Sequence, residues 1–206
     1  MGTLPPEITR EGARKDLEDI QKVFDVHGVR LFLTYGALLG IYRDGDFIPY
    51  DDDIDLCIVD TISYQKRMEL GWSLMDIGFT PQPISFLVYS RLRPSAPGYN
   101  GDDKSGIIVC QRNIRVTLFF FGEEQCPEHG PEMVCVPHYK GARLISTPSH
   151  FFDKPDTIKY KGKKYLTPSP IKEYMVYMYG DDWKKPIKGK HAPQWSSLHP
   201  FKSPQT

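Results

Sequence analysis

Four aspartates occupy five consecutive positions, residues 51 to 55, and apolar residues that favour β-strands follow them at once. The stretch reads IPYDDDIDLCIV, so Asp51, Asp52, Asp53 and Asp55 open a segment that would otherwise be buried. Like charges repel, and a carboxylate that enters a folded interior loses its hydration. A fold that tolerates this arrangement needs a positive charge between the carboxylates.

The alternation of a strand gives these aspartates different roles. Successive side chains point to opposite faces, so Asp53 and Asp55 share one face while Ile54 enters the core. Two such carboxylates suit a divalent metal ion, typically Mg²⁺ with Mn²⁺ as the alternative, with substrate phosphates completing the shell. We expect Asp51 to orient these ligands or to add another, and Asp52 to face away. A solvated acidic turn before an ordinary strand is the competing interpretation.

The segment TYGALLG, shortly before the aspartates, favours the metal site over the acidic turn. It predicts the end of a strand, a glycine at position 36 that allows close approach of the backbone, and the start of a helix. A helix N-terminus offers free N–H groups and a partial positive charge, which both suit phosphate. Together with the aspartates, this segment predicts a site for a metal and a nucleotide.

Hydrophobic periodicity predicts the order of the remaining elements. Helices are expected at Thr9–Val26, over ALLGIY, from Tyr64 to Gly78 with Tyr64, Met68, Trp72 and Met75 on one face, and at Ser169–Gly180. Strands are expected at Val29–Gly36, Asp53–Val59, Ser85–Arg93, Gly106–Phe121, EMVCVPH and ARLIST. This order predicts an α+β fold, a mixed β-sheet flanked by helices, in a single domain spanning 1–206. Its core would cover about 9–148, and a loop-rich C-terminal extension about 149–206.

Charge and cysteine content narrow the classes of protein. The chain has 26 basic and 26 acidic residues, so it lacks the basic excess typical of nucleic-acid-binding proteins. No apolar run is long enough to cross a bilayer, and we expect a cytoplasmic protein unless the chain was trimmed from a membrane-anchored or secretory-pathway protein. The four cysteines are too few for a disulfide scaffold, and we expect free thiols.

The block GALLGIYRDGDFIPYDDDID resembles the LicD and fukutin-related family, whose pattern joins GTLLG to an arginine and then to FIPWDDDID. The later segment YMVYMYGDDWKKP is similar to the closing part of that family. The resemblance implies a nucleotidyltransferase fold. It also implies that Asp53 and Asp55 are catalytic and bind the metal, and that Asp51 is a further catalytic aspartate.

The same resemblance places Gly36 and Ala37 in a phosphate-binding turn and aligns Arg43 with the family arginine. A planar guanidinium pairs well with phosphate, although a surface ion pair is the competing interpretation for Arg43. Two positions depart from the family. Ala37 lacks the usual hydroxyl but keeps its backbone N–H, and Thr117 stands where a third carboxylate is expected. Either Asp51 substitutes for that carboxylate, another one folds in, the site binds one metal, or activity is reduced or lost.

The function that the resemblance implies is Mg²⁺-dependent transfer of a phospho-alcohol group. The group would be phosphocholine or a polyol phosphate, and it would move from a CDP-alcohol donor to a glycan acceptor. Two alternatives stay open. One is a nucleotidyltransferase that uses a nucleoside triphosphate to modify a small molecule or protein. The other is a catalytically weak or inactive homologue that binds nucleotide.

Two further motifs have competing interpretations. The motif Cys-x-x-His occurs twice and could supply four zinc ligands, whereas a hairpin with buried thiols is the favoured interpretation; the residues are Cys126, His129, Cys135 and His138. The segment IKYKGKKY predicts a lysine-rich hairpin that either receives an anionic substrate or, as we favour, blocks aggregation at a sheet edge; its lysines are Lys159, Lys161, Lys163 and Lys164.

Overall fold

A mixed seven-stranded sheet, in the order β3-β4-β5-β2-β1-β9-β8, forms the centre of the protein. The computed structural model describes residues 6–49, 51–81, 106–120, 133–137 and 144–186. The strands of this sheet are β1 (Phe32–Leu33), β2 (Asp53–Ile58), β3 (Thr80–Pro81), β4 (Gly106–Gln111), β5 (Arg115–Phe120), β8 (Asp156–Tyr160) and β9 (Lys163–Thr167). A separate antiparallel pair consists of β6 (Met133–Pro137) and β7 (Leu144–Pro148).

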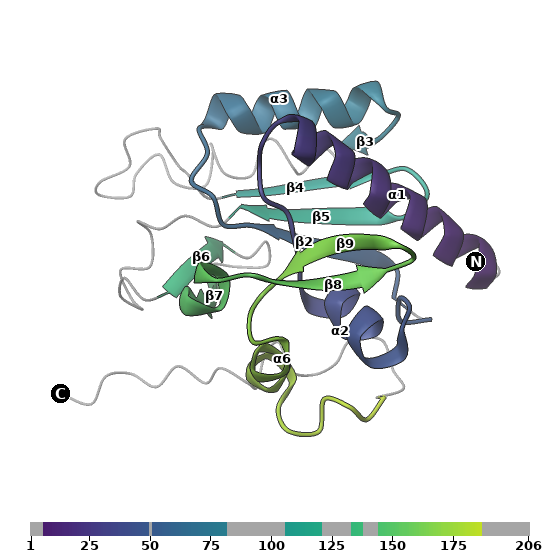
Figure 1. The fold of residues 1–206 in the computed structure, drawn as a ribbon. Helices are drawn as coiled ribbons and strands as arrows, with labels where there is room; N and C mark the ends of the chain where they lie inside the picture. The colour runs from purple at the N-terminus through teal and green to yellow at the C-terminus, as the bar shows by residue number, and fades with distance from the viewer. Residues whose placement is uncertain (1–5, 50, 82–105, 121–132, 138–143, 187–206) are drawn as a thin grey trace.

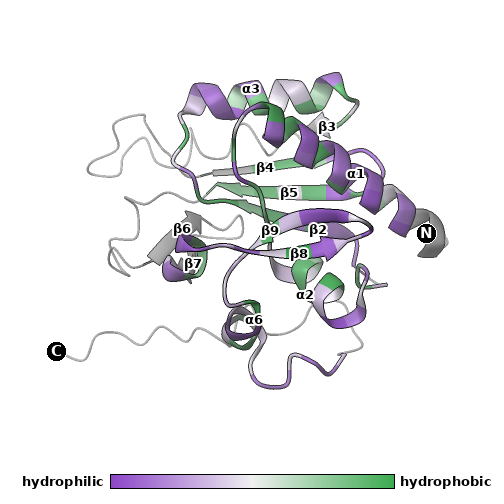
Figure 2. Cartoon of the chain, viewed as in Figure 1, coloured by the Kyte–Doolittle hydropathy of each residue, from purple (hydrophilic) through white to green (hydrophobic). Residues whose placement is uncertain are grey.

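Helices flank the sheet, which confirms the predicted mixed α and β architecture. They are α1 (Pro6–Val26), α2 (Tyr35–Asp44), α3 (Tyr64–Asp76), α5 (His150–Asp153) and α6 (Ile171–Tyr179). Figure 1 shows α1 and α3 on one side of the sheet and α2 and α6 on the other. The middle strands β2 and β5 are mostly hydrophobic (Figure 2), and Leu56 and Leu118 in them are 0 % exposed. Among the described residues, no helix combines the length and the apolar character that crossing a membrane requires.

Strand β2 lies inside the sheet, and its pairing determines what surrounds the aspartates. It runs parallel to β5, so that Asp53 lies opposite Arg115 and Asp55 lies opposite Thr117. On its other edge it runs antiparallel to the short strand β1, which leads directly into α2. The start of β2, the start of β5 and the N-terminus of α2 therefore meet.

The turn from β1 into α2 is tighter than the sequence predicts. The expected strand Val29–Gly36 is reduced to two residues, because Tyr35 already begins the helix. Tyr35 has a φ of 48°, a left-handed conformation that costs a residue with a side chain about 1–2 kcal/mol. Its ring is 1 % exposed and lies edge-on to Phe119, with 5.5 Å between the ring centroids. Burial of this ring holds the strained turn in place.

Other boundaries also differ from the predictions. The expected strand Gly106–Phe121 consists of β4 and β5, which pair antiparallel and are joined by a turn at 112–114. Strands β8 and β9 fall in the predicted C-terminal extension, yet β9 pairs with β1, so the core continues past residue 148. The predicted strand Ser85–Arg93 lies outside the described residues. The single domain over 1–206 stays a prediction.

Helix α3 presents its predicted apolar face to solvent. Tyr64, Trp72 and Met75 are 60 %, 55 % and 47 % exposed. The side chains that pack inward come from the opposite face and include Leu70 and Leu74, which are 0 % and 1 % exposed. Helical spacing grouped the four apolar side chains on one face, but only the packing shows which face of the helix is buried.

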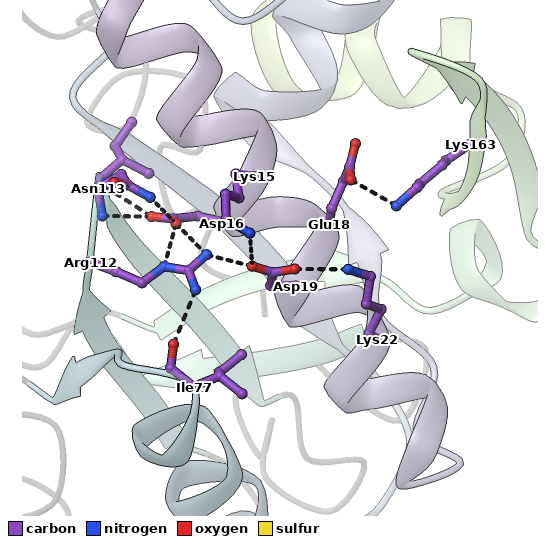
Figure 3. A network of polar contacts seen from close by, with 10 residues as sticks. Lys15, Asp16, Glu18, Asp19, Lys22, Ile77, Arg112, Asn113 and Lys163 are labelled. Carbon is purple, nitrogen blue, oxygen red and sulfur yellow. Dashed lines mark hydrogen bonds and ion pairs between the residues drawn. The ribbon is translucent and has the colours of Figure 1, made fainter.

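The turn between β4 and β5 is fixed to α1 by a buried carboxylate (Figure 3). Asp16 is 0 % exposed and accepts hydrogen bonds from the backbone N–H groups of Asn113 and Ile114, at 2.9 and 3.1 Å. It also accepts from Arg112 Nε at 2.8 Å and from the Asn113 amide at 2.7 Å. A buried carboxylate with this many donors is well compensated for its lost hydration. The network sets the position at which β5 begins.

Asp19, beside this network, is expected to make stability depend on pH. Burial alone would raise its pKa, but hydrogen bonds from Lys22, Arg112 and Lys15 outweigh burial and lower the pKa of Asp19 below its ordinary value. The unfolded chain then binds the proton more readily, so this contribution is present above about pH 4 and is lost as the pH falls further.

We expect Asp19→Asn to lower the free energy of unfolding by about 1 kcal/mol at pH 7 and to flatten its decline in acid. Chemical denaturation at pH 3, 5 and 7 measures both effects. The control is Asp25→Asn, because the Asp25 carboxylate is exposed and accepts from Gln21 of the same helix. Equal pH dependence in the two variants would contradict the expectation.

Candidate active site

The aspartates at the start of β2 alternate as the sequence predicts. Asp53 and Asp55 are partly buried on one face of the strand, and Ile54 between them is 0 % exposed. Arg115 and Thr117 lie opposite them on β5 in the same order. Asp51, Asp52, Asp53 and Asp55 therefore form a row of carboxylates at the start of β2, beside α2.

Within this row, Asp52 lies close to Asp51 and Asp53. One carboxylate oxygen from each of Asp51, Asp52 and Asp53 lies within 4.8 Å of the others. Two oxygens bound to one Mg²⁺ ion lie within about 4.2 Å of each other, given Mg–O distances of about 2.1 Å, so small side-chain shifts would seat an ion here. The prediction that Asp52 faces away from the site is wrong: its side chain is 84 % exposed, but its carboxylate lies beside those of Asp51 and Asp53. These carboxylates could hold a divalent cation, with Asp55 deeper on the same strand.

Burial and neighbouring negative charges raise the pKa of two of these carboxyl groups, Asp51 and Asp55. Burial, reinforced by the charges of Asp53 and Asp52 and by a hydrogen bond with Asp53, raises the pKa of Asp51 to about 7. Burial raises the pKa of Asp55 well above its ordinary value, and Asp53 and Asp51 raise it further. Carboxylates that repel one another in a partly buried site are stabilised by a cation among them.

Thr117, which stands where the family resemblance predicts a third carboxylate, contacts Asp55. Its side chain is 9 % exposed and hydrogen-bonds with Asp55, which favours the charged form of that carboxyl group. A threonine is a poor Mg²⁺ ligand, but here it orients a candidate ligand. No other described carboxylate groups with Asp51, Asp52 and Asp53 at metal-ligand spacing.

Gly36 packs closely against the side chain of Asp51 at the N-terminus of α2. A Cβ at position 36 would overlap a carboxylate oxygen of Asp51, so only glycine fits against this side chain. Thr34, the N-cap residue, makes no side-chain capping bond; its hydroxyl contacts the Asp55 carbonyl at 3.3 Å and Cys57 Sγ at 3.1 Å. Ala37 is the third residue of the helix and is 2 % exposed. The first turn of α2 thus lies beside the carboxylates, as an anion-binding site requires.

The sequence analysis assigned one arginine to the site, and the structure places a different one there. Arg43 lies in the last turn of α2 and pairs with Asp44 through Nε at 2.9 Å and Nη2 at 2.6 Å. This contact matches the competing interpretation of Arg43 as an ion-pair residue. Arg115 was missed. Its Nη2 lies 2.5 Å from Asp53 Oδ2 and 3.6 Å from Asp52 Oδ1, and the pairing follows from strand register, which a single sequence does not reveal.

Tyr179, at the end of α6, is a further residue that the sequence analysis did not assign to the site. Burial raises its pKa, and the charges of Asp55 and Asp51 raise it further, whereas Arg43 opposes them. Its phenol group therefore lies within electrostatic reach of these three side chains. The segment that resembled the family's closing part packs toward the aspartates.

The remaining candidate residues have mixed outcomes. Cys126, His129 and His138, and the side chain of Cys135, lie outside what the structure describes, so the zinc site stays a prediction. The described thiols of Cys57 and Cys110 are free and buried. The lysine-rich hairpin is confirmed as β8 and β9, with Lys159 opposite Lys164 and Lys163 paired with Glu18 at 2.8 Å.

Comparison with known protein families gives a match over the segment that carries the aspartates. Residues 28–80, which include β1, α2 and β2, match the family described as LicD/FKTN/FKRP, nucleotidyltransferase domain. This match agrees with the resemblance of the aspartate block to the same family.

Two relatives extend the similarity beyond this segment. They are the ribitol-5-phosphate transferase FKTN of Macaca fascicularis and that of Homo sapiens, each 26 % identical over 184 residues. The alignments cover 87 % of this chain but 34 % of each relative, so the chain spans about a third of the relatives' length. A crystal structure of the lincosamide antibiotic adenylyltransferase LnuA with lincomycin bound gives a TM-score of 0.44 at 15 % identity, covering 75 % of this chain and 79 % of that one. This likeness is too low to support an argument.

Proposed function

We propose that this protein is a divalent-cation-dependent transferase that moves a phospho-alcohol group from a CDP-activated donor to a glycan hydroxyl. The observation that supports this most is the row of carboxylates at the start of β2, which packs against a glycine at the N-terminus of α2. A divalent ion and a diphosphate need carboxylate oxygens and backbone N–H groups side by side. The predicted cytoplasmic location stays a prediction.

The residues of the site would have different tasks. Asp53 and Asp55 would hold a Mg²⁺ ion, whose charge, when it is bound, stabilises the diphosphate and the departing cytidine monophosphate. The first turn of α2, with Gly36 and Ala37, would bind the phosphates through backbone N–H groups. Thr117 keeps Asp55 oriented. Tyr179 lies within electrostatic reach of Asp51 and Asp55 and would form part of the wall of the site.

The transfer itself needs one proton acceptor. The acceptor hydroxyl attacks the phosphorus that carries the alcohol, a new P–O bond forms, and the P–O bond to cytidine monophosphate breaks. We assign Asp51 to receive the hydroxyl proton, because it sits beside the candidate metal ligands and is held by contact with Gly36. Cytidine monophosphate leaves with the electrons of the broken bond.

The donor's alcohol is proposed from the relatives. Both are ribitol-5-phosphate transferases by name, which favours a polyol phosphate over phosphocholine. The purified chain should therefore be tested with CDP-ribitol, CDP-choline, CTP and ATP, each with Mn²⁺ and with a chelator. We expect CDP-ribitol with Mn²⁺ to raise the melting temperature by about 5 °C at a hundredfold excess over its Kd.

The other outcomes identify the alternatives. A shift with CTP or ATP and none with either CDP-alcohol would indicate a nucleotidyltransferase. The absence of any shift, together with no Mn²⁺ binding in calorimetry, would indicate an inactive homologue, for which Thr117 in place of a carboxylate is the motivating observation. Either result would overturn the proposed function.

A further inference from the structure

Arg115 lies beside the aspartate row and pairs with two of its carboxylates. It is the first residue of β5, and the parallel register places it directly opposite Asp53. Its Nη2 contacts both Asp53, at 2.5 Å, and Asp52, at 3.6 Å. One guanidinium thus neutralises part of a site that holds four aspartates.

The position of Arg115 is fixed by its backbone rather than by its side chain. The two preceding residues, Asn113 and Ile114, donate their N–H groups to the buried carboxylate of Asp16 (Figure 3). The backbone at the start of β5 is therefore anchored to α1. The side chain of Arg115, by contrast, is 45 % exposed and can turn away from Asp53 without disturbing the sheet.

The contacts of Arg115 with the two carboxylates leave it further N–H groups for a second partner. A guanidinium carries five N–H groups, and the two carboxylate contacts use Nη2. Nε and Nη1 take no part in these contacts. A diphosphate bridged to Asp53 by a divalent ion would bring phosphate oxygens close to the same carboxylate, which is the geometry that arginine binds well.

From these contacts we propose that Arg115 is an exchangeable counterion: it neutralises Asp53 until a divalent cation replaces it, and then binds the phosphates of a nucleoside diphosphate. The inference rests on the proposed function, because it requires a metal at the aspartates. It assigns Arg115 two successive partners of opposite charge. A permanent structural ion pair between Arg115 and Asp53 is the competing explanation.

Another ion pair of the same sheet supplies a matched control. Arg30 pairs with Asp60, just past the opposite end of β2, through Nε at 2.8 Å and Nη2 at 2.5 Å. The side chains are 48 % and 24 % exposed, against 45 % and 22 % for Arg115 and Asp53. Arg30→Gln and Arg115→Gln therefore change the net charge equally and expose similar carboxylates, but only one lies at the site.

The test measures binding of Mn²⁺ alone and then of CDP at saturating Mn²⁺, by calorimetry, in the native chain and both variants. Arg115→Gln removes the cation that competes with the metal, so we expect Mn²⁺ to bind about two- to fivefold more tightly. The same variant loses a phosphate partner, so CDP should bind about tenfold more weakly. Arg30→Gln should match the native chain in both titrations.

Any other result for Arg115→Gln contradicts the inference that Arg115 is an exchangeable counterion. Unchanged or weaker Mn²⁺ binding by Arg115→Gln would show a permanent structural pair, and unchanged CDP binding would exclude the phosphate contact. If the native chain binds CDP and Mn²⁺ normally in these cases, the proposed function survives. If the native chain binds no Mn²⁺, the proposed function and this inference both fail. Melting temperatures with chelator present verify that all three proteins are folded.

Discussion

Asp53→Asn is expected to weaken Mn²⁺ binding and to slow turnover severely while the protein stays folded. Asp53 lies within metal-ligand spacing of Asp51 and Asp52 and shares a strand face with Asp55. Loss of a residue that only supports a ligand costs about 10- to 100-fold in affinity, so loss of the ligand itself should cost about a hundredfold or more. Turnover should fall about a thousandfold, because charge stabilisation by the metal is worth several kcal/mol. Calorimetry and release of cytidine monophosphate measure the two effects.

The neighbouring aspartates separate two ligand sets. If the metal is held on the strand face, Asp55→Asn should match Asp53→Asn and Asp52→Asn should lose less than about tenfold. If the exposed carboxylate of Asp52 holds the metal instead, Asp52→Asn should be the variant that loses the most Mn²⁺ affinity. Asparagine keeps the shape of aspartate and relieves like-charge repulsion, so the metal-free melting temperature should not fall.

Asp76→Asn, at the exposed end of α3, is the control and should behave as the native chain. Retention of Mn²⁺ affinity and turnover within a few-fold in both Asp53→Asn and Asp55→Asn would rule out the proposed site.

Gly36→Ala is expected to damage the site far more than the fold. The new Cβ would overlap the Asp51 carboxylate, which must then move. The displaced atom is the end of a side chain, and alanine favours a helix over glycine by about 1 kcal/mol, so the free energy of unfolding should change by less than about 1 kcal/mol. Affinity for Mn²⁺ with CDP should nevertheless fall about tenfold or more, because small displacements of oriented groups are costly.

Two other glycines give the contrast for this prediction. Gly28 has a φ of 67° and no atom within 4 Å of an added Cβ, so Gly28→Ala should cost about 1 kcal/mol of stability and leave binding intact. At Gly40 the added Cβ would lie 2.7 Å from the backbone of Asp46 and Ile48, so Gly40→Ala should cost about 2 kcal/mol. Denaturation and calorimetry on the three variants measure both quantities. If Gly36→Ala binds Mn²⁺ and CDP with native affinity, Asp51 takes no part in the site.

The local features of the site could be predicted from the sequence. Alternation along a strand depends on residues two apart, so the shared face of Asp53 and Asp55 follows directly from the order of the residues. The glycine before a helix start and the aspartate block carry their own signals, and both lie within residues 28–80, which match the family model. The zinc candidates and the strand at Ser85–Arg93 lie outside the described residues and stay predictions.

The partners of these aspartates depend on contacts between distant segments. Arg115 lies 62 residues from Asp53, and Thr117 reaches Asp55 through the same parallel pairing. The buried carboxylate of Asp16 fixes that register from 97 residues away. Register between strands far apart in sequence leaves no periodic signal, because many pairings would satisfy the same hydrophobic pattern.

The sequence by itself therefore determined where the acidic groups stand, which of them share a face and which family this segment resembles, since these depend on neighbouring residues. Only the tertiary structure decided that Arg115 neutralises Asp53, that Gly36 cradles Asp51, that the apolar face of α3 is exposed and that β8 and β9 complete the sheet. Each of these follows from packing between elements, which the local pattern of a chain does not specify.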